Sequence, residues 1–263
     1  MLSVVQASAA PIAAPAKLRV KGVSVSFERD GQPMPVLDDV NLHVNEGEFL
    51  CILGPSGCGK STLLSAMGGF LIPPSGEIRI DEQIVRGPDP RRIFVFQERG
   101  VFPWLTVTGN IAFGLHRLAP ADRQQRVTHY INMVGLQGFE QSYPAELSGG
   151  MKQRLEVARA LAVNPDVLFL DEPFSALDSI TRLTMRKELL RIWQAERKTI
   201  VLVTHDIDEA IQLADHVILL TSRPATVQEV VSIPVEHPRD TLSADYLALR
   251  AHIARKIGLP ERI

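Results

Sequence analysis

The sequence has no run of about 18 consecutive apolar residues, the length that a membrane-spanning helix requires. It has two cysteines, Cys51 and Cys58, which are too few for a disulfide framework and fit a reducing cytoplasm. Neither sign of charge dominates, because 28 Lys and Arg are balanced by 30 Asp and Glu. The even charge argues against a nucleic acid as a partner.

What the chain does have is the composition of an ordinary folded protein. Of its 263 residues, 45% are hydrophobic and 22% are charged, which is typical of a globular chain long enough for one large α/β domain. Residues 1–17 differ, since they are rich in Ala and Pro and carry no charge before Lys17. A secretory signal needs a basic start and a longer apolar run, so we expect residues 1–17 to be a disordered lead-in.

Strand signals begin after this lead-in. Residues 18–29 and 36–44 alternate apolar and polar side chains on either side of a Gly-Gln-Pro turn, which predicts an antiparallel hairpin. Residues 48–53, 166–170 and 199–203 are apolar runs next to segments with helical spacing. Buried strands that alternate with helices predict an α/β fold, with a mostly parallel sheet covered on both faces.

Two stretches differ from this alternation. Residues 106–163 have helical spacing with almost no strand signal, which predicts a helical insertion at the side of the sheet. After Leu220 the pattern predicts one or two short strands around residues 227–233. We expect residues 234–263 to form a C-terminal tail with a helix at residues 243–257.

The sequence GPSGCGKS, residues 54–61, matches the phosphate-binding pattern G-x-x-x-x-G-K-[ST]. Its glycines let successive backbone N–H groups point at anionic oxygens, and the following helix adds its positive end. Lys60 is expected to reach the β- and γ-phosphates, and the Ser61 hydroxyl to bind Mg²⁺. A Gly-rich turn could match by accident, but the strand before it and the helix after it favour the phosphate site. The nucleotide-binding residues predicted here are Gly54, Pro55, Ser56, Gly57, Cys58, Gly59, Lys60, Ser61 and Thr62.

A phosphate loop needs a carboxylate at the end of a neighbouring buried strand, and the run DVLFLDE supplies two. Asp171 is placed where this strand leaves the sheet, so we expect it to hold Mg²⁺ or its water shell. Glu172 follows and is placed to orient or deprotonate the attacking water. The alternative is that both residues only cap the next helix.

The sequence LSGGMKQR, residues 147–154, places a hydroxyl and free N–H groups at the start of a predicted helix, which makes an anion site. An ordinary N-cap is the alternative. Here the chain resembles the ABC (ATP-binding cassette) ATPase family, whose signature is LSGGQ. Met151 replaces the usual Gln, a change familiar in importer subunits. The predicted binding residues are Ser148, Gly149 and Gly150.

The resemblance implies a P-loop NTPase fold of the ABC type, with an N-terminal antiparallel β-subdomain, over residues 18–233. It implies ATP and Mg²⁺ as cofactors and a dimer, by default a homodimer, in which two subunits meet head to tail. Ser148 and Gly150 of one subunit would then clamp the γ-phosphate held by Lys60 of the other.

Four further positions match family motifs. The resemblance implies that Gln97 senses Mg²⁺ or the water and links to the permease, and that residues 175–178 (SALD) cross the dimer interface. It implies that His205 bonds the γ-phosphate and the water, and that Phe27 stacks on adenine. A lone His is more often a surface residue, and Phe27 could equally be a core or edge-strand residue.

The resemblance also implies partners. Any transport pathway must be another polypeptide, so the ATPase would lie peripherally at the cytoplasmic face of the inner membrane, beside integral-membrane permease subunits. These would receive solute from a periplasmic or surface solute-binding protein. Residues 102–105 (FPWL) predict an exposed docking surface for the permease. The alternative is that Trp104 packs under the helical insertion.

Several segments, including FPWLTV and the SRPATV stretch around Arg223 and Pro224, resemble an importer subgroup for nitrate, taurine, alkanesulfonates and related solutes. Two other classes are a non-transport ABC ATPase acting on soluble machinery and a free-standing P-loop kinase or GTPase. The first usually has two fused cassettes or a long coiled-coil insertion, and the second needs neither LSGGM nor His205.

Overall fold

The computed structural model describes residues 16–96, 100–175 and 177–258, so most of the predicted lead-in lies outside the described residues. The chain divides into two compact units. The first unit comprises residues 1–87 and 203–263, and the second comprises residues 88–202. Within the described residues, no helix is long and apolar enough to cross a membrane.

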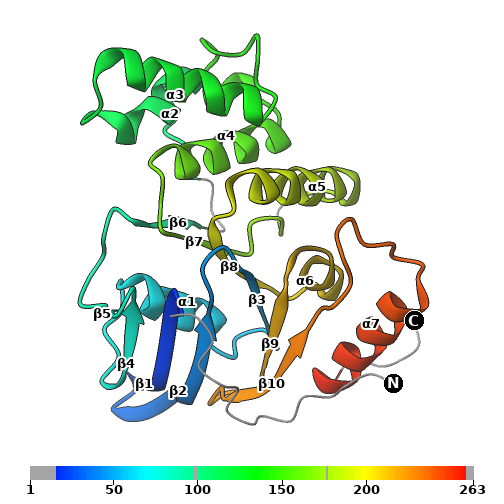
Figure 1. Cartoon of the computed structure of the whole chain (residues 1–263). Coiled ribbons are helices and arrows are strands. Elements are labelled where there is room, and N and C mark those ends of the chain that lie inside the picture. The colour runs from blue at the N-terminus through cyan, green and yellow to red at the C-terminus, as the bar shows by residue number, and fades with distance from the viewer. Residues whose placement is uncertain (1–15, 97–99, 176, 259–263) are drawn as a thin grey trace. The chain divides into compact units, whose positions relative to one another are not determined.

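An antiparallel sheet forms the beginning of the first unit (Figure 1). The predicted hairpin is present, and Leu18 pairs with Val44 at its open end while Phe27 pairs with Met34 near its turn. The strands lie in the order β2-β1-β4-β5, so β1 is an inner strand. They are β1 (Leu18–Arg29), β2 (Gln32–Val44), β4 (Ser75–Ile80) and β5 (Gln83–Ile84).

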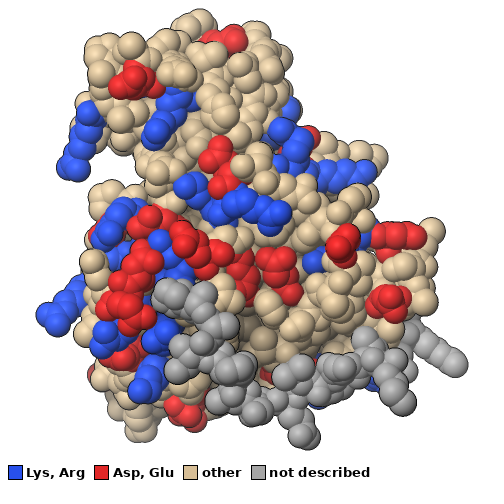
Figure 2. Space-filling model, in the orientation of Figure 1, with Lys and Arg blue, Asp and Glu red and all other residues tan. Residues whose placement is uncertain are grey.

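Charged side chains on this sheet pair with close neighbours. Arg79 Nε lies 3.0 Å from Glu77 Oε1, and Arg19 Nη1 lies 3.6 Å from Glu82 Oε1. Figure 2 shows one face of the molecule, on which basic and acidic side chains are interspersed over these strands. Exposed pairs of this kind add little stability, so the sheet is held mainly by its ladder and its apolar face.

The rest of the first unit carries the predicted phosphate loop. All five residues of β3 are buried, as a strand covered on both faces requires. Strand β3 pairs in parallel with β9, and β9 pairs antiparallel with β10. The elements are β3 (Phe49–Leu53), α1 (Lys60–Gly68), the end of β8 (Thr199–Thr204), α6 (Ile207–Leu213), β9 (His216–Leu220), β10 (Val227–Ser232) and α7 (Ala244–Lys256).

The second unit contains the start of β8 and its neighbours β7 and β6, with β6 and β7 parallel. The stretch predicted to be helical, residues 106–163, is fully described and contains helices and no strand. Its core is formed where α2, α3 and α4 pack on one another. The elements are β6 (Arg92–Val95), α2 (Val107–Ala112), η1 (Phe113–Leu115), α3 (Pro120–Met133), η2 (Pro144–Glu146), α4 (Gly149–Ala162), β7 (Val167–Asp171) and α5 (Ser179–Glu196).

A partly buried ion pair joins the residue before β3 to the first residue of β9. His216 Nδ1 lies 2.6 Å from Glu48 Oε1, and the other Glu48 oxygen accepts from the Asn45 N–H at 2.7 Å. The hydrogen bond to Glu48 raises the pKa of His216, although burial opposes it. Burial raises the pKa of Glu48, but the bonds from His216 and Asn45 outweigh it and leave that pKa lowered.

We expect this pair to make stability depend on pH. Because the pKa of His216 is higher in the folded state, its contribution is complete below about pH 6.5 and is lost as pH rises through the folded pKa. The melting temperature should therefore fall between pH 6 and pH 9, and His216→Gln should remove most of that slope. His116→Gln, a change at an exposed histidine, is the control. An unchanged slope in His216→Gln would contradict the role of the pair.

Candidate nucleotide-binding site

The phosphate loop joins β3 to α1 in the first unit. Gly57 and Gly59 have φ of +72° and +121°, values that favour glycine. A Cβ added at Gly59 would lie 2.8 Å from Val36 Cγ1 on β2, so the loop also needs glycine for close packing. Lys60 is buried and its Nζ reaches back over the loop, donating to the carbonyls of Gly54 at 2.8 Å and Pro55 at 3.0 Å.

The donors of this loop fit a polyphosphate. In the described parts of the chain, the hydrogen bonds of Lys60 go to carbonyl oxygens and none goes to a carboxylate, so its buried charge is not neutralised there. A buried cation is stable only when an anion compensates it. The helix that starts at Lys60 adds a positive end at the same place. Together they form a cradle for an anion.

Two predicted residues lie elsewhere in the first unit. Phe27 is 42% exposed, so it is not a core residue, and its ring is accessible to a ligand. It pairs with Met34 of β2 and lies beyond the β1 residues that pair with β4, which end at Ser24, so the edge-strand alternative stays open. His205 is exposed directly after β8. Next to it Asp206 caps α6 by accepting from the N–H groups of Asp208 and Glu209. This cap fixes the segment that carries His205.

Strand β3 lies close to both the loop and the His205 segment. Burial raises the pKa of Cys51 well above its usual range, Glu209 and Asp206 raise it further, and Lys60 opposes them. These three charges act on one fully buried thiol at the centre of the sheet. The phosphate loop and the start of α6 therefore lie around the same strand within the first unit.

The carboxylates Asp171 and Glu172 belong to the second unit. Asp171 is the last residue of β7, as predicted, and both residues are partly exposed. Glu172 has φ of +45°, a left-handed conformation that is uncommon for a residue with a side chain. Its carbonyl accepts from both the N–H of Ser175 at 3.2 Å and the Ser175 hydroxyl at 2.9 Å. A strained backbone conformation that surrounding hydrogen bonds maintain is typical of functional residues.

The loop after Glu172 is tied to helix α4. The side-chain amide of Gln153 donates to the carbonyl of Pro173, and Phe174 is buried. At the other end of the loop, Arg182 donates to the carbonyl of Leu177 at 3.0 Å. Within the second unit, the loop after Glu172 is therefore bonded directly to α4, the helix that begins in the LSGGM sequence.

The predicted signature lies at the mouth of a cavity of about 520 Å³. Ser148 is the N-cap of α4, and its hydroxyl accepts from the Met151 N–H at 3.3 Å. A Cβ on Gly150 would approach Thr181 Cγ2 to 3.0 Å, so the start of α4 packs against α5. The cavity is lined by Ser148, Gly149, Gly150, Met151, Arg154, Leu177, Asp178, Ile180, Thr181, Thr184 and Met185. Hydroxyls and backbone groups at a helix start make this wall suitable for an anion.

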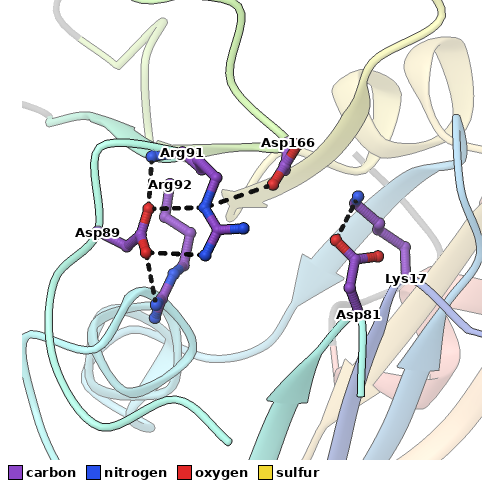
Figure 3. Close-up of polar contacts among 6 residues, drawn as sticks. All are labelled: Lys17, Asp81, Asp89, Arg91, Arg92 and Asp166. Carbon is purple, nitrogen blue, oxygen red and sulfur yellow. Dashed lines mark hydrogen bonds and ion pairs between the residues drawn. The ribbon is translucent and has the colours of Figure 1, made fainter. Parts of the chain in front are cut away.

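An ion cluster fixes the strands that lead to the second unit's site residues (Figure 3). Asp89 accepts from the Arg91 side chain and backbone, and its pKa is lowered to about 2 mainly by those bonds. Arg91 Nε also lies 3.9 Å from Asp166 Oδ2, and the Asp166 N–H donates to the Arg91 carbonyl at 2.7 Å. The cluster therefore joins the start of β6 to the start of β7.

The predicted site residues fall into two groups. The first unit holds the phosphate loop, Phe27 and His205, and the second holds Asp171, Glu172 and the signature residues 148–150. Gln97 lies outside the described residues, as does Ala176 of the SALD motif. Within the described residues, no group of three or more His, Cys, Asp or Glu could hold a metal ion.

A cluster of exposed aromatic residues lies in the second unit. Trp104 is 68% exposed and Phe113 is 58% exposed, and the rings of both contact the partly buried Phe102. Trp104 therefore does not pack under the helical insertion. We call Phe102, Trp104 and Phe113 the aromatic surface.

Polar side chains of α2 and α4 hold the loop that carries Phe102 in place. Asn110 is fully buried, accepts from the N–H of Phe102 at 2.8 Å and donates to its carbonyl at 3.1 Å. Arg159 lies over the Phe102 ring at 4.5 Å, and Glu156 accepts from the Gly100 N–H at 3.0 Å. Both charged residues belong to α4, the helix that begins at the signature. Asn110, Glu156 and Arg159 could not be found from sequence patterns, because each acts through a contact with a loop.

The comparisons with known proteins agree with this architecture. The family model described as ABC transporter matches residues 37–175. An uncharacterised ABC transporter ATP-binding protein of Methanocaldococcus jannaschii is 46% identical over 239 residues, which cover 90% of each chain. The nitrate import ATP-binding protein NrtD of Synechococcus elongatus is 45% identical over 223 residues, which cover 83% of this chain and 81% of the relative.

A third relative and a solved structure extend the comparison. The aliphatic sulfonates import ATP-binding protein SsuB of Bacillus cereus is 40% identical over 237 residues, covering 90% of this chain and 94% of the relative. The solved dimeric structure of an ATP-binding cassette in a post-hydrolysis state, bound to ADP and Pi, is 32% identical with a TM-score of 0.71. That match covers 83% of this chain and 100% of the other. The chain therefore belongs to the ABC transporter family, and it is an ABC-type ATPase that drives transport.

Proposed function

We propose that two copies of this chain enclose two ATP molecules, each between the phosphate loop of one copy and the signature of the other. The unneutralised Lys60 supports the first half of this site, and the cavity beside Ser148 supports the second. The cassette of similar fold is dimeric with ADP and Pi bound. Ser148 and Gly150 would contact the terminal phosphate with a hydroxyl and a backbone N–H.

Within this site Glu172 accepts the proton of the attacking water, and His205 and Gln97 orient that water and the terminal phosphate. The left-handed backbone of Glu172 supports its role, because the loop holds the backbone at this residue in a conformation that costs energy. Phe27, which is accessible at the end of β1, stacks on the adenine ring.

Mg²⁺ would be held by the Ser61 hydroxyl and Asp171. A hydroxyl, one carboxylate, waters and phosphate oxygens are ligands that Mg²⁺ prefers. Bound there, Mg²⁺ would neutralise charge that develops on the phosphate oxygens.

The aromatic surface is the observation that carries the proposed coupling to a separate permease. Exposed aromatic side chains on a rigid base are typical of binding hot spots. Here the base is the buried Asn110 and the two charged residues of α4. A partner bound at Trp104 would contact, through Phe102 and Arg159, the helix whose first turn contains the signature.

The proposed direction of transport is import, and the proposed cargo is taurine, an alkanesulfonate, nitrate or a related small solute. Two relatives support this through their names, which state nitrate import and aliphatic sulfonates import. We propose that the cargo reaches the permease from a solute-binding protein, and that this chain lies at the cytoplasmic face of the membrane.

One purification tests the importer proposal. We expect tagged Glu172→Gln, purified with ATP from detergent-solubilised membranes of its host, to carry a permease and a solute-binding protein that mass spectrometry identifies. Adding Trp104→Ser should reduce the recovered permease by about tenfold, because Trp104 would be a central contact. Adding Phe70→Ser, at another exposed aromatic residue, should not.

Three results would contradict parts of the proposal. Full recovery of the permease with Trp104→Ser would show that the aromatic surface is not the docking site. Soluble machinery in place of a permease would contradict the importer assignment and favour the non-transport alternative. Calorimetric titration of the recovered binding protein with taurine, an alkanesulfonate and nitrate identifies the cargo. Binding of none of these solutes would contradict the proposed solute class.

A further inference from the structure

The loop between β9 and β10, which includes the SRPATV sequence, is anchored to β2 in the first unit. Ala225 is fully buried, and its N–H donates to the Val36 carbonyl at 2.8 Å. Its carbonyl accepts from the Asp38 N–H at 2.9 Å. The backbone of this loop is therefore fixed two residues after Arg223.

From this anchored loop, Arg223 contacts the phosphate loop. Its Nη2 donates to the Gly57 carbonyl at 2.7 Å, and its Nε donates to the same oxygen at 3.2 Å. The remaining nitrogen, Nη1, lies 3.1 Å from Met34 Sδ on β2. In the described parts of the chain no carboxylate pairs with Arg223, so its strongest contact is with the phosphate loop.

The peptide that joins Gly57 to Cys58 has its two polar groups on opposite sides, because a trans peptide points its C=O and N–H in opposite directions. The C=O accepts from Arg223, whereas the Cys58 N–H donates to the Pro55 carbonyl at 3.3 Å. Lys60 Nζ donates to that same Pro55 oxygen at 3.0 Å. The N–H therefore lies on the side where Lys60 would meet the phosphates.

The orientation of the Gly57–Cys58 peptide must be fixed by contacts with residues outside the phosphate loop. Gly57 has φ of +72°, and a glycine rotates more freely than any other residue. The other glycines of the loop are confined by packing, since a Cβ on Gly59 would lie 2.8 Å from Val36 and one on Gly54 would lie 3.1 Å from Leu220. At Gly57 such a Cβ would lie 3.7 Å from Arg223 Nη2, so packing confines this residue less. Hydrogen bonds restrain its peptide instead: the 3.3 Å bond from the Cys58 N–H to Pro55, and the shorter, charged bond from Arg223 to the C=O. Rotation of the peptide would replace an N–H donor by a carbonyl that repels phosphate.

We propose that Arg223 is a positioning residue for the phosphate loop: it holds the Gly57 carbonyl outward so that the Cys58 N–H faces the β- and γ-phosphates. A charged donor also polarises the peptide and strengthens the N–H at its other end. The inference rests on the proposed role of residues 54–61 as the phosphate site. It assigns to the SRPATV segment a role in nucleotide affinity.

The test compares Arg223→Gln, Arg223→Lys and the surface control Arg19→Gln with the wild type. We expect Arg223→Gln to bind ATP and ADP about tenfold more weakly, as loss of a charged hydrogen bond implies, and AMP within about twofold. Arg223→Lys, which keeps one charged donor, should be intermediate. KM for ATP should rise with the dissociation constant, and kcat at saturating ATP and the melting temperature should match those of Arg19→Gln.

The outcomes separate this inference from the phosphate site itself. Equal weakening of AMP and ATP, or a fall in kcat together with the melting temperature, would show that Arg223 has only a structural role. Wild-type affinities in Arg223→Gln would overturn the inference as well. Lys60→Ala, measured in parallel, should lose ATP binding. If it does and Arg223→Gln does not, the phosphate site stands and only the role of Arg223 fails.

Discussion

Glu172→Gln should hydrolyse ATP about 10²- to 10⁴-fold more slowly than the wild type, because the general base is lost. Its affinity for ATP should stay within about threefold, since the amide keeps the shape of the carboxylate and the phosphate loop is unchanged. With hydrolysis blocked and ATP bound, the dimer should persist. Size-exclusion chromatography with and without Mg-ATP, together with phosphate release, measures both effects.

The control for this variant is Glu188→Gln, which changes a carboxylate on α5 that pairs with Arg191 at 3.0 Å. It should hydrolyse ATP at the wild-type rate and should not accumulate as a dimer. A Glu172→Gln protein that stays monomeric in saturating Mg-ATP would contradict the shared site. One that hydrolyses ATP normally would contradict the role of Glu172 and leave its strained backbone without an explanation.

Ser148→Arg should bind ATP as the wild type does but lose hydrolysis by about 100-fold or more. The arginine would occupy the wall of the cavity where the partner's terminal phosphate is proposed to lie. The phosphate loop, which belongs to the other unit of the chain, is not altered by this change. Nucleotide titration and steady-state phosphate release separate the two properties.

Ser243→Arg is a matched control for the structural part of this effect. Ser243 is the N-cap of α7 and accepts from the Tyr246 N–H at 3.3 Å, the same distance as the Ser148 bond to Met151. Loss of either cap costs about 1 kcal/mol of stability. Only Ser148→Arg should lose hydrolysis. If both variants lose it equally, the effect comes from helix capping and not from the signature.

Part of the element order could be predicted, because those segments depend on local patterns, whereas β4, β5 and β9 were not predicted. The change from alternation to helical spacing located β3 and α1, and β7 ends at Asp171, where its apolar run predicted the carboxylate. Each of these patterns lies within one short segment, because the buried positions of that segment require apolar residues. The phosphate loop was visible for the same reason, since its glycines are required by its own backbone.

Other parts of the site depend on contacts between distant segments and could not be predicted. Arg223 and Gly57 are 166 positions apart, and the SRPATV sequence indicated only a family likeness. The left-handed backbone of Glu172 has no sequence signal, because that conformation is rare for any residue with a side chain. Asn110 looks in the sequence like any polar residue of a short helix, and only the structure shows its four hydrogen bonds to the backbone of Phe102, Leu105 and Thr106.

The central claim is that each ATP is held by two chains, and mixing two inactive variants tests it most directly. Lys60→Ala and Ser148→Arg should each lack activity alone. A dimer with one copy of each has one fully damaged site and one intact site, because the intact Lys60 and the intact Ser148 come from different copies. An equal mixture should therefore recover about a quarter of wild-type ATPase activity if the two sites work independently. A mixture that stays as inactive as either variant alone would contradict the shared site.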